Sequence, residues 1–222
     1  MIAKALSREE FDIIGFQEVL PHIHPWLHEH LEGYTVVGCG REGDRDGEGT
    51  PIAYKSDKFY LFSFDTFWLS PTPAVPGSRF LRDQSGCPRV CSVAVLIDKA
   101  THGIVRVYNT HLDHVGENAR KKGMSVVLKR IAKDGKLFPD SHVVLMGDFN
   151  AYPDSPFLQN IDGLTDVTAH IPVTFHAYNN PKAFGKIDYI YTDMKAENVR
   201  ILDDEREGVY LSDHYPVAAE LQ

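Results

Sequence analysis

The sequence is poor in cysteine and has no long apolar run. Its three cysteines, Cys39, Cys87 and Cys91, form no CxxC pair, so neither a disulfide framework nor a cysteine metal site is expected. No apolar segment approaches the ~20 residues that a membrane-spanning helix needs. Residues 1–6 lack the basic-then-apolar layout of a secretory signal. These absences predict reduced thiols, no transmembrane segment and a cytoplasmic location.

Basic stretches are also missing. The formal net charge is −8, and the longest run of Lys and Arg is Arg120-Lys121-Lys122. A protein that grips duplex DNA usually presents a basic face to the phosphate backbone. Carboxylates that gather around a divalent cation also add to a negative balance. The charge therefore weakens, without excluding, a long nucleic-acid substrate, and it favours a small molecule or a single strand.

The organisation of the chain predicts one domain over residues 1–222, as a monomer. Composition is 43% hydrophobic and 24% charged, with no internal repeat or low-complexity linker, which is typical of a folded protein. Buried-strand patterns fall at 12–17, 34–38, 59–67, 89–97, 103–110, 142–146, 186–192, 197–202 and 216–221. Helical patterns fall at 1–11, 22–31 and 117–132, and 70–88 is expected to be a long loop. The mixture of hairpins and strand–helix alternation indicates an α/β (α+β) protein in which two sheets pack face to face with helices outside.

Polar side chains gather where the predicted strands end. These positions are Glu18, His111, Asp148, Asn150, Asp188, Asp213 and His214. Loops at one edge of a layered α/β protein can converge on a single site. Taken singly, an Asp at a strand end is more often a cap or a turn residue, and a lone His is usually structural. Their combination predicts a site for hydrolysis of a phosphate ester.

Each role follows from what that hydrolysis needs. A hard cation with oxygen ligands neutralises developing charge, and Glu18 and Asp213 suit it. A histidine near neutral pH takes a proton from water if a carboxylate fixes its other ring nitrogen. His214 and Asp188 are predicted to form this pair.

The remaining three residues are predicted to handle the water and the phosphate. Asp148 and Asn150 are two apart, so in an extended chain both side chains project to one face. One holds the water while the amide of Asn150 donates to a phosphate oxygen. His111 is expected to be cationic beside the phosphate and to stabilise a non-bridging oxygen.

The sequence resembles the endonuclease/exonuclease/phosphatase superfamily of metal-dependent phosphoesterases from about Asp12 to its end. The motifs that carry the resemblance are Ile14-Gly15-Phe16-Gln17-Glu18-Val19, Tyr108-Asn109-Thr110-His111-Leu112, Met146-Gly147-Asp148-Phe149-Asn150-Ala151, Lys186-Ile187-Asp188-Tyr189-Ile190 and Leu211-Ser212-Asp213-His214-Tyr215-Pro216-Val217. The resemblance implies a four-layer α/β/β/α sandwich of two packed mixed sheets, Mg²⁺ or Mn²⁺, and in-line attack of water on phosphorus. It gives Glu18, His111, Asp148, Asn150, Asp188 and His214 the roles stated above.

A narrower similarity to an uncharacterised bacterial branch adds candidate substrate contacts. Gly40-Arg41, Pro88-Arg89, the segment 109–116 and Thr174-Phe175-His176 carry it. It implies that Arg41, Arg89, His114 and His176 contact the substrate. Surface or loop-stabilising roles explain these four equally well.

One departure from the family pattern concerns the first strand. Gln17-Glu18 comes almost at once, without the Asn-bearing strand that usually precedes it, so we expect either a chain that begins late or a fold without that strand. Losing it would leave a neighbouring strand unpaired. An alternative to the enzyme is therefore a non-catalytic binding module on the same fold. Within the enzyme class, phosphodiesters and phosphomonoesters both remain open as substrates.

Overall fold

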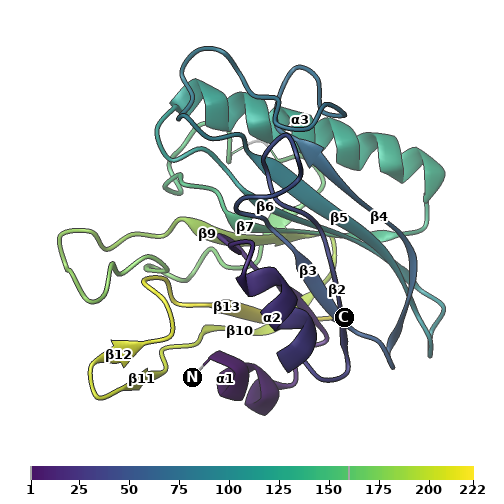
Figure 1. The fold of residues 1–222 in the computed structure, drawn as a ribbon. Coiled ribbons are helices and arrows are strands. Elements are labelled where there is room, and N and C mark those ends of the chain that lie inside the picture. The colour runs from purple at the N-terminus through teal and green to yellow at the C-terminus, as the bar shows by residue number, and fades with distance from the viewer. Residues whose placement is uncertain (1, 160) are drawn as a thin grey trace.

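The computed structural model describes residues 2–159 and 161–222, which form four layers (Figure 1). Helix α3 (Glu117–Leu137) lies across one face of a six-stranded sheet. Smaller strands pack against the other face, and α1 (Ile2–Glu9) and α2 (Ile23–His30) lie outside them. The predicted α/β sandwich is therefore confirmed. Within the described residues, no helix is both long enough and apolar enough to cross a membrane.

The six-stranded sheet is mixed. Its order is β4-β5-β6-β7-β9-β8, with bounds β4 (Phe59–Trp68), β5 (Val90–Asp98), β6 (Ile104–His111), β7 (His142–Asp148), β8 (Thr165–Asp166) and β9 (Asp188–Thr192). Strands β6 and β7 are parallel, and the other neighbours are antiparallel. Helix α3 connects β6 to β7, as a parallel pair requires. The carboxyl ends of β6 and β7 thus meet at one edge.

The second strand layer consists of separate antiparallel pieces. One is β1 (Ile13–Gly15), β3 (Ile52–Lys55) and β2 (Tyr34–Val37), in the order β1-β3-β2, and the other pairs β10 (Ala196–Ile201) with β13 (Val217–Leu221). Strands β11 (Glu205–Arg206) and β12 (Val209–Tyr210) form a short hairpin. In the described chain β1 and β13 each have one neighbour.

Side-chain alternation along the central strands builds a core on both faces of the large sheet. On β5, Val93 packs towards α3 with Met124 and Leu145, while Leu96 packs towards the second layer with Ile52. A third cluster joins α2 to the small sheet through residues such as Leu27, Val36 and Ala53. Burial on both faces explains why β5 reads as a continuous apolar run.

Candidate active site

His111, Asp148 and Asp188 lie side by side at one edge of the large sheet. In the strand register, His111 on β6 is opposite Asp148 on β7, and Asp148 is opposite Asp188 on β9. Residues directly opposite each other on neighbouring strands project from the same face. The two carboxyl ends of β6 and β7 and the start of antiparallel β9 therefore bring three chemically active side chains to one level.

Gly147 allows this close approach. Its φ is +138°, and a Cβ there would lie 1.9 Å from the Thr110 carbonyl oxygen. A side chain at this position would push β7 away from β6 immediately before Asp148. Glycine is therefore required by both conformation and space.

His214 reaches the same edge from the turn before β13. Its Nδ1 lies 2.8 Å from Asp188 Oδ2. The turn is tied down because Tyr215 N donates to Thr174 O at 2.7 Å, and Thr174 Oγ1 accepts from Asp188 N at 3.0 Å. The structure thus brings His214 and Asp188 together with a fixed orientation. A carboxylate on Nδ1 fixes the tautomer and leaves Nε2 for chemistry.

The local charges set the protonation of this cluster. Burial acts to lower the pKa of His214, but the hydrogen bond to Asp188 and the nearby carboxylates outweigh it and raise that pKa to about 9. Burial, together with repulsion from Asp188, raises the pKa of Asp148. The carboxylates of Asp148 and Asp188 thus face a single positive ring, that of His214.

The electrostatics of the free protein favour a neutral His111 over the cation expected beside phosphate. Burial lowers its pKa well below the usual value, and the positive charges of Arg89 and Arg41 lower it further. Its Nε2 lies 3.4 Å from Asp148 Oδ2. A neutral imidazole has one donor nitrogen and one acceptor nitrogen, so His111 offers hydrogen bonding rather than charge.

Asn150 sits in a left-handed backbone conformation, with a φ of +48°. Its backbone N–H donates to Asp148 Oδ1 at 2.7 Å, and its Nδ2 donates to Leu112 O at 3.0 Å. The second Nδ2 hydrogen is not used in that bond. The short turn after β7 therefore holds Asn150 beside Asp148 through a left-handed residue rather than the extended chain that was expected.

Glu18 is exposed at the end of β1 and also has a positive φ, of +56°. A buried residue that the sequence reasoning did not single out, Asn109, sets its position. Asn109 Nδ2 lies 2.8 Å, 3.1 Å and 3.0 Å from the carbonyl oxygens of Phe16, Thr50 and Pro51, and its Oδ1 accepts from Gln17 Nε2 at 2.7 Å. An Asn between strand residues of β6 was the only signal that could have revealed it.

Asn109→Ala is therefore expected to destabilise the protein by about 2–4 kcal/mol, because it leaves buried polar groups without partners. Denaturant unfolding followed by circular dichroism measures this. Asn118→Ala is the matched control, since Asn118 is exposed in the first turn of α3, where Ala is well tolerated. Equal stability of the two variants would contradict the positioning role of Asn109.

A metal ion suits the donor chemistry of this edge. One ligand atom from each of Asp148, Asp188 and His214 lies within 4.8 Å of the others, the one such set found in the described residues. Carboxylate oxygens are the ligands that Mg²⁺ and Mn²⁺ prefer, and the ring of His214 offsets only part of the charge of the two crowded carboxylates. Glu18 and Asp213 stand outside this close set, so their assignment as ligands stays a prediction.

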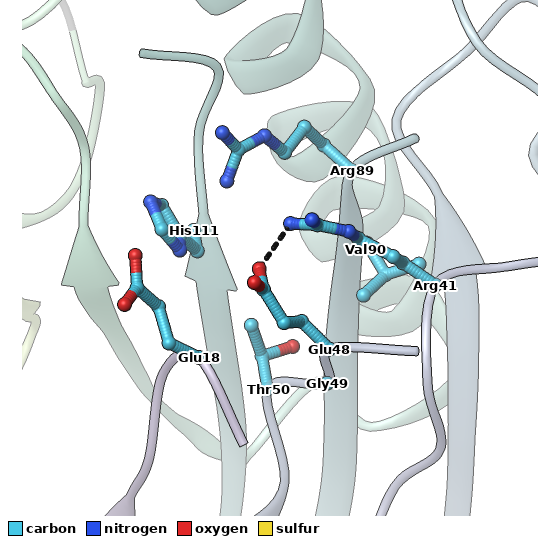
Figure 2. Close-up of a pocket in the computed structure, with 8 residues that line it drawn as sticks. All are labelled: Glu18, Arg41, Glu48, Gly49, Thr50, Arg89, Val90 and His111. Atoms are coloured by element: carbon cyan, nitrogen blue, oxygen red, sulfur yellow. Dashed lines mark ion pairs between the residues drawn. The ribbon is translucent and has the colours of Figure 1, made fainter. Parts of the chain in front are cut away.

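The four candidate substrate contacts divide into two groups. Arg41 and Arg89 line one small pocket with Glu18 and His111 (Figure 2), and the ring of His114 contacts Arg89, with Nδ1 2.7 Å from Nη2. His176 is absent from that lining. It is fully buried, stacks on Tyr215 with ring centroids 4.1 Å apart, and its backbone N–H donates to Asp213 O at 2.9 Å.

Comparisons with known proteins agree with this architecture. The sequence matches the Endonuclease/Exonuclease/phosphatase family over residues 1–214. No curated protein matches the chain. Among solved structures, an endonuclease/exonuclease/phosphatase from Bacteroides vulgatus is 31% identical with a TM-score of 0.87, over 100% of this chain and 88% of that one.

A mannosyl-6-phosphatase from Bacteroides thetaiotaomicron is 30% identical, with a TM-score of 0.86, over 100% of this chain and 89% of that one. TDP2 from D. rerio, solved with a single-strand DNA product, is 18% identical with a TM-score of 0.77, over 97% of this chain and 88% of that one. The TDP2 likeness shows the fold alone.

A sandwich with His, Asp and Asn side chains gathered at one sheet edge is the architecture of a phosphoesterase. The chain belongs to the Endonuclease/Exonuclease/phosphatase family, so the recognition made from the motifs is confirmed.

Proposed function

We propose that the protein hydrolyses a phosphate ester with water, with His214 as the general base and Asp188 as the residue that orients it. The contact of 2.8 Å between His214 Nδ1 and Asp188 Oδ2, beside Asp148, carries this proposal. A base held in one tautomer next to a water-binding carboxylate is the arrangement that general-base hydrolysis needs.

In the proposed reaction, a water held by Asp148 gives its proton to Nε2 of His214. The water oxygen forms a bond to phosphorus as the bond to the ester oxygen breaks, and the leaving oxygen then takes up a proton. The amide of Asn150 and the neutral ring of His111 hydrogen-bond the non-bridging oxygens. His176 acts through the backbone of Asp213 and holds the turn that bears His214. A Mg²⁺ or Mn²⁺ ion held by Glu18, with help from Asp213, supplies positive charge for the phosphate.

Chelation tests the metal requirement. Excess EDTA is expected to abolish turnover, and Mg²⁺ or Mn²⁺ to restore it, because the phosphate charge is otherwise left without compensation. The substrates are a panel of sugar phosphates, to which the mannosyl-6-phosphatase relative directs attention, together with other phosphorylated metabolites and single-stranded oligonucleotides. Full activity in excess chelator would rule out the metal mechanism.

Calorimetry separates the enzyme from a non-catalytic binding module. An enzyme binds Mg²⁺ or Mn²⁺ and turns over at least one ester in the panel. Binding of metal and phosphorylated compounds without turnover of any of them would favour the module.

A further inference from the structure

The pocket shared by Glu18 and His111 has a second wall built from two arginines (Figure 2). Arg41 comes from the loop before β3, and Arg89 comes from the residue before β5. The space open to water-sized groups in this pocket is about 10 Å³, which is about the room that one water occupies. An oxygen atom of a ligand fits this space.

The arginines present hydrogen-bond donors that have no protein acceptor. Within the described residues, six buried side-chain polar atoms lack a partner, and three of them are Arg41 Nε, Arg89 Nε and Arg89 Nη1. Only 5% of the Arg89 side chain and 12% of the Arg41 side chain are exposed. An unsatisfied buried donor costs about 1–3 kcal/mol. Arg41 Nε and Arg89 Nε lie 3.8 Å and 3.6 Å from the carboxylates of Glu42 and Asp113, beyond hydrogen-bond range. Arg89 Nη1 is therefore the donor that most clearly lacks an acceptor, and it points to one that arrives with a ligand.

The backbone holds Arg41 in place. Its N–H donates to Glu48 O at 3.0 Å, and its carbonyl accepts from Trp68 Nε1 at 2.6 Å. Gly40 lets the loop close, because a Cβ there would lie 2.0 Å from the Asp46 carbonyl oxygen. The guanidinium forms an ion pair with Glu48 at 2.5 Å (Figure 2), and its Nε lies 3.8 Å from Glu42 Oε1 without a hydrogen-bond partner.

The neighbours of Arg89 orient its side chain but do not use all of its hydrogen-bond donors. Arginine has no acceptor, so His114 Nδ1 accepts from Nη2 at 2.7 Å. Asp113 lies 3.6 Å from Nε, but its oxygens are engaged by the backbone of Ser85, Val115 and Gly116. Asp113 therefore offsets charge while leaving the donors of Arg89 unused. Burial and the charge of Arg41 lower the pKa of Arg89. A bound anion would offset the burial of this charge and its repulsion from Arg41.

Resting on the proposed function, we propose that Arg41 and Arg89 bind an unesterified phosphate oxygen and make the protein selective for phosphomonoesters over phosphodiesters. A monoester at neutral pH is a dianion with three unesterified oxygens. The groups around Asp148 and Glu18 take two of them, and the arginine pocket takes the third. A diester carries one negative charge less and would have to place its second ester arm elsewhere. Buried bonds from guanidinium to phosphate are strong and geometrically specific.

Two esters with the same leaving group test this selectivity: p-nitrophenyl phosphate and methyl p-nitrophenyl phosphate, each with Mg²⁺. The native protein is expected to favour the monoester in kcat/KM. Arg89→Met is expected to lower kcat/KM for the monoester roughly 10²-fold and for the diester less than about 10-fold, because only the monoester uses the lost charged bonds. Arg82→Met, on the same loop and exposed, is the matched control and should change neither value.

Binding measured by calorimetry does not depend on turnover. Inorganic phosphate is expected to bind more tightly than diethyl phosphate, and Arg89→Met to remove that difference. Arg41→Met and Arg89→Lys serve if Arg89→Met does not fold, since the first retains one cationic side chain in the pocket and the second retains two. Equal losses for the two esters and the two anions, a native preference for the diester, or failure of the native protein to bind phosphate would overturn the inference. If no ester is hydrolysed but phosphate binding depends on Arg89 as stated, the proposed function fails and the anion pocket stands.

Discussion

His214→Ala is expected to lower kcat roughly 10²–10⁴-fold, the usual cost of removing a positioned general base. Asp188→Asn is expected to cost a similar order, because it removes the carboxylate bonded to Nδ1. Since the two residues act as a unit, the double variant should be far less impaired than the product of the single effects. Steady-state kinetics on the substrate identified in the panel measures all three.

The pH dependence gives a second readout. The base must be neutral to accept a proton, and the surrounding carboxylates raise the pKa of His214 to about 9. The rate should therefore increase with pH up to at most this value. Asp188→Asn removes a bond that favours the charged ring, so the acid limb of its profile should move to lower pH. A merely structural Asp188 would leave the limb in place.

His142→Ala is the matched control. His142 and Asp193 also form a pair, with His142 Nδ1 3.5 Å from Asp193 Oδ1. They lie at the beginning of β7, the end opposite Asp148. Their loss should leave kcat unchanged, and a fully active His214→Ala would defeat the assignment of the base.

The sequence indicates where the site lies because its polar residues directly follow predicted strands. The apolar run 142–146 gave β7, and the polar residues after it had to lie at the sheet edge where the parallel neighbour β6 also ends. The parallel pairing itself follows from the helix between the two runs. The local sequence pattern was therefore enough to predict which residues lie at this edge of the sheet.

Tertiary contacts decided what the pattern did not show. The predicted helix 117–132 extends to Leu137, because Asp134 accepts from Tyr108 Oη at 2.8 Å and from Arg130 Nε at 2.9 Å, which holds the last turn against the sheet. The two-residue strands β8, β11 and β12 are too short to show a period. The neutral state of His111 depends on burial and on arginines distant in sequence.

Asp148→Asn is expected to abolish most activity and yet stabilise the metal-free protein. Burial and repulsion from Asp188 raise the pKa of Asp148 in the folded state. Below the unfolded pKa of about 4 both states are protonated, so the group has no effect there. As the pH rises from about 4 towards the folded pKa, the unfolded state alone ionises and the stability of the folded state decreases. The ionisation of Asp148 should therefore lower the stability of the native protein in EDTA over this range. Asp148→Asn lacks the ionisable group and should not show this loss.

Thermal melts in EDTA at a series of pH values measure the difference. At neutral pH, Asp148→Asn should melt above the native protein by about 2–4 °C for each kcal/mol gained. The shape of the site is retained, because an amide oxygen still accepts from Asn150 N and a neutral His111 can accept from the new N–H. Asp154→Asn, exposed in the following loop, should leave the melting temperature unchanged.

Added Mg²⁺ should reverse the order of the two melting temperatures. A cation at this edge offsets the charges of Asp148 and Asp188, so it stabilises the native protein in proportion to its affinity, whereas the variant has lost one of those charges. The same carboxylate is thus unfavourable to the fold and favourable to the cation, as residues in catalytic sites often are. A variant that melts below the native protein in EDTA at every pH would show that Asp148 stabilises the fold, and the account of an uncompensated charge would be wrong.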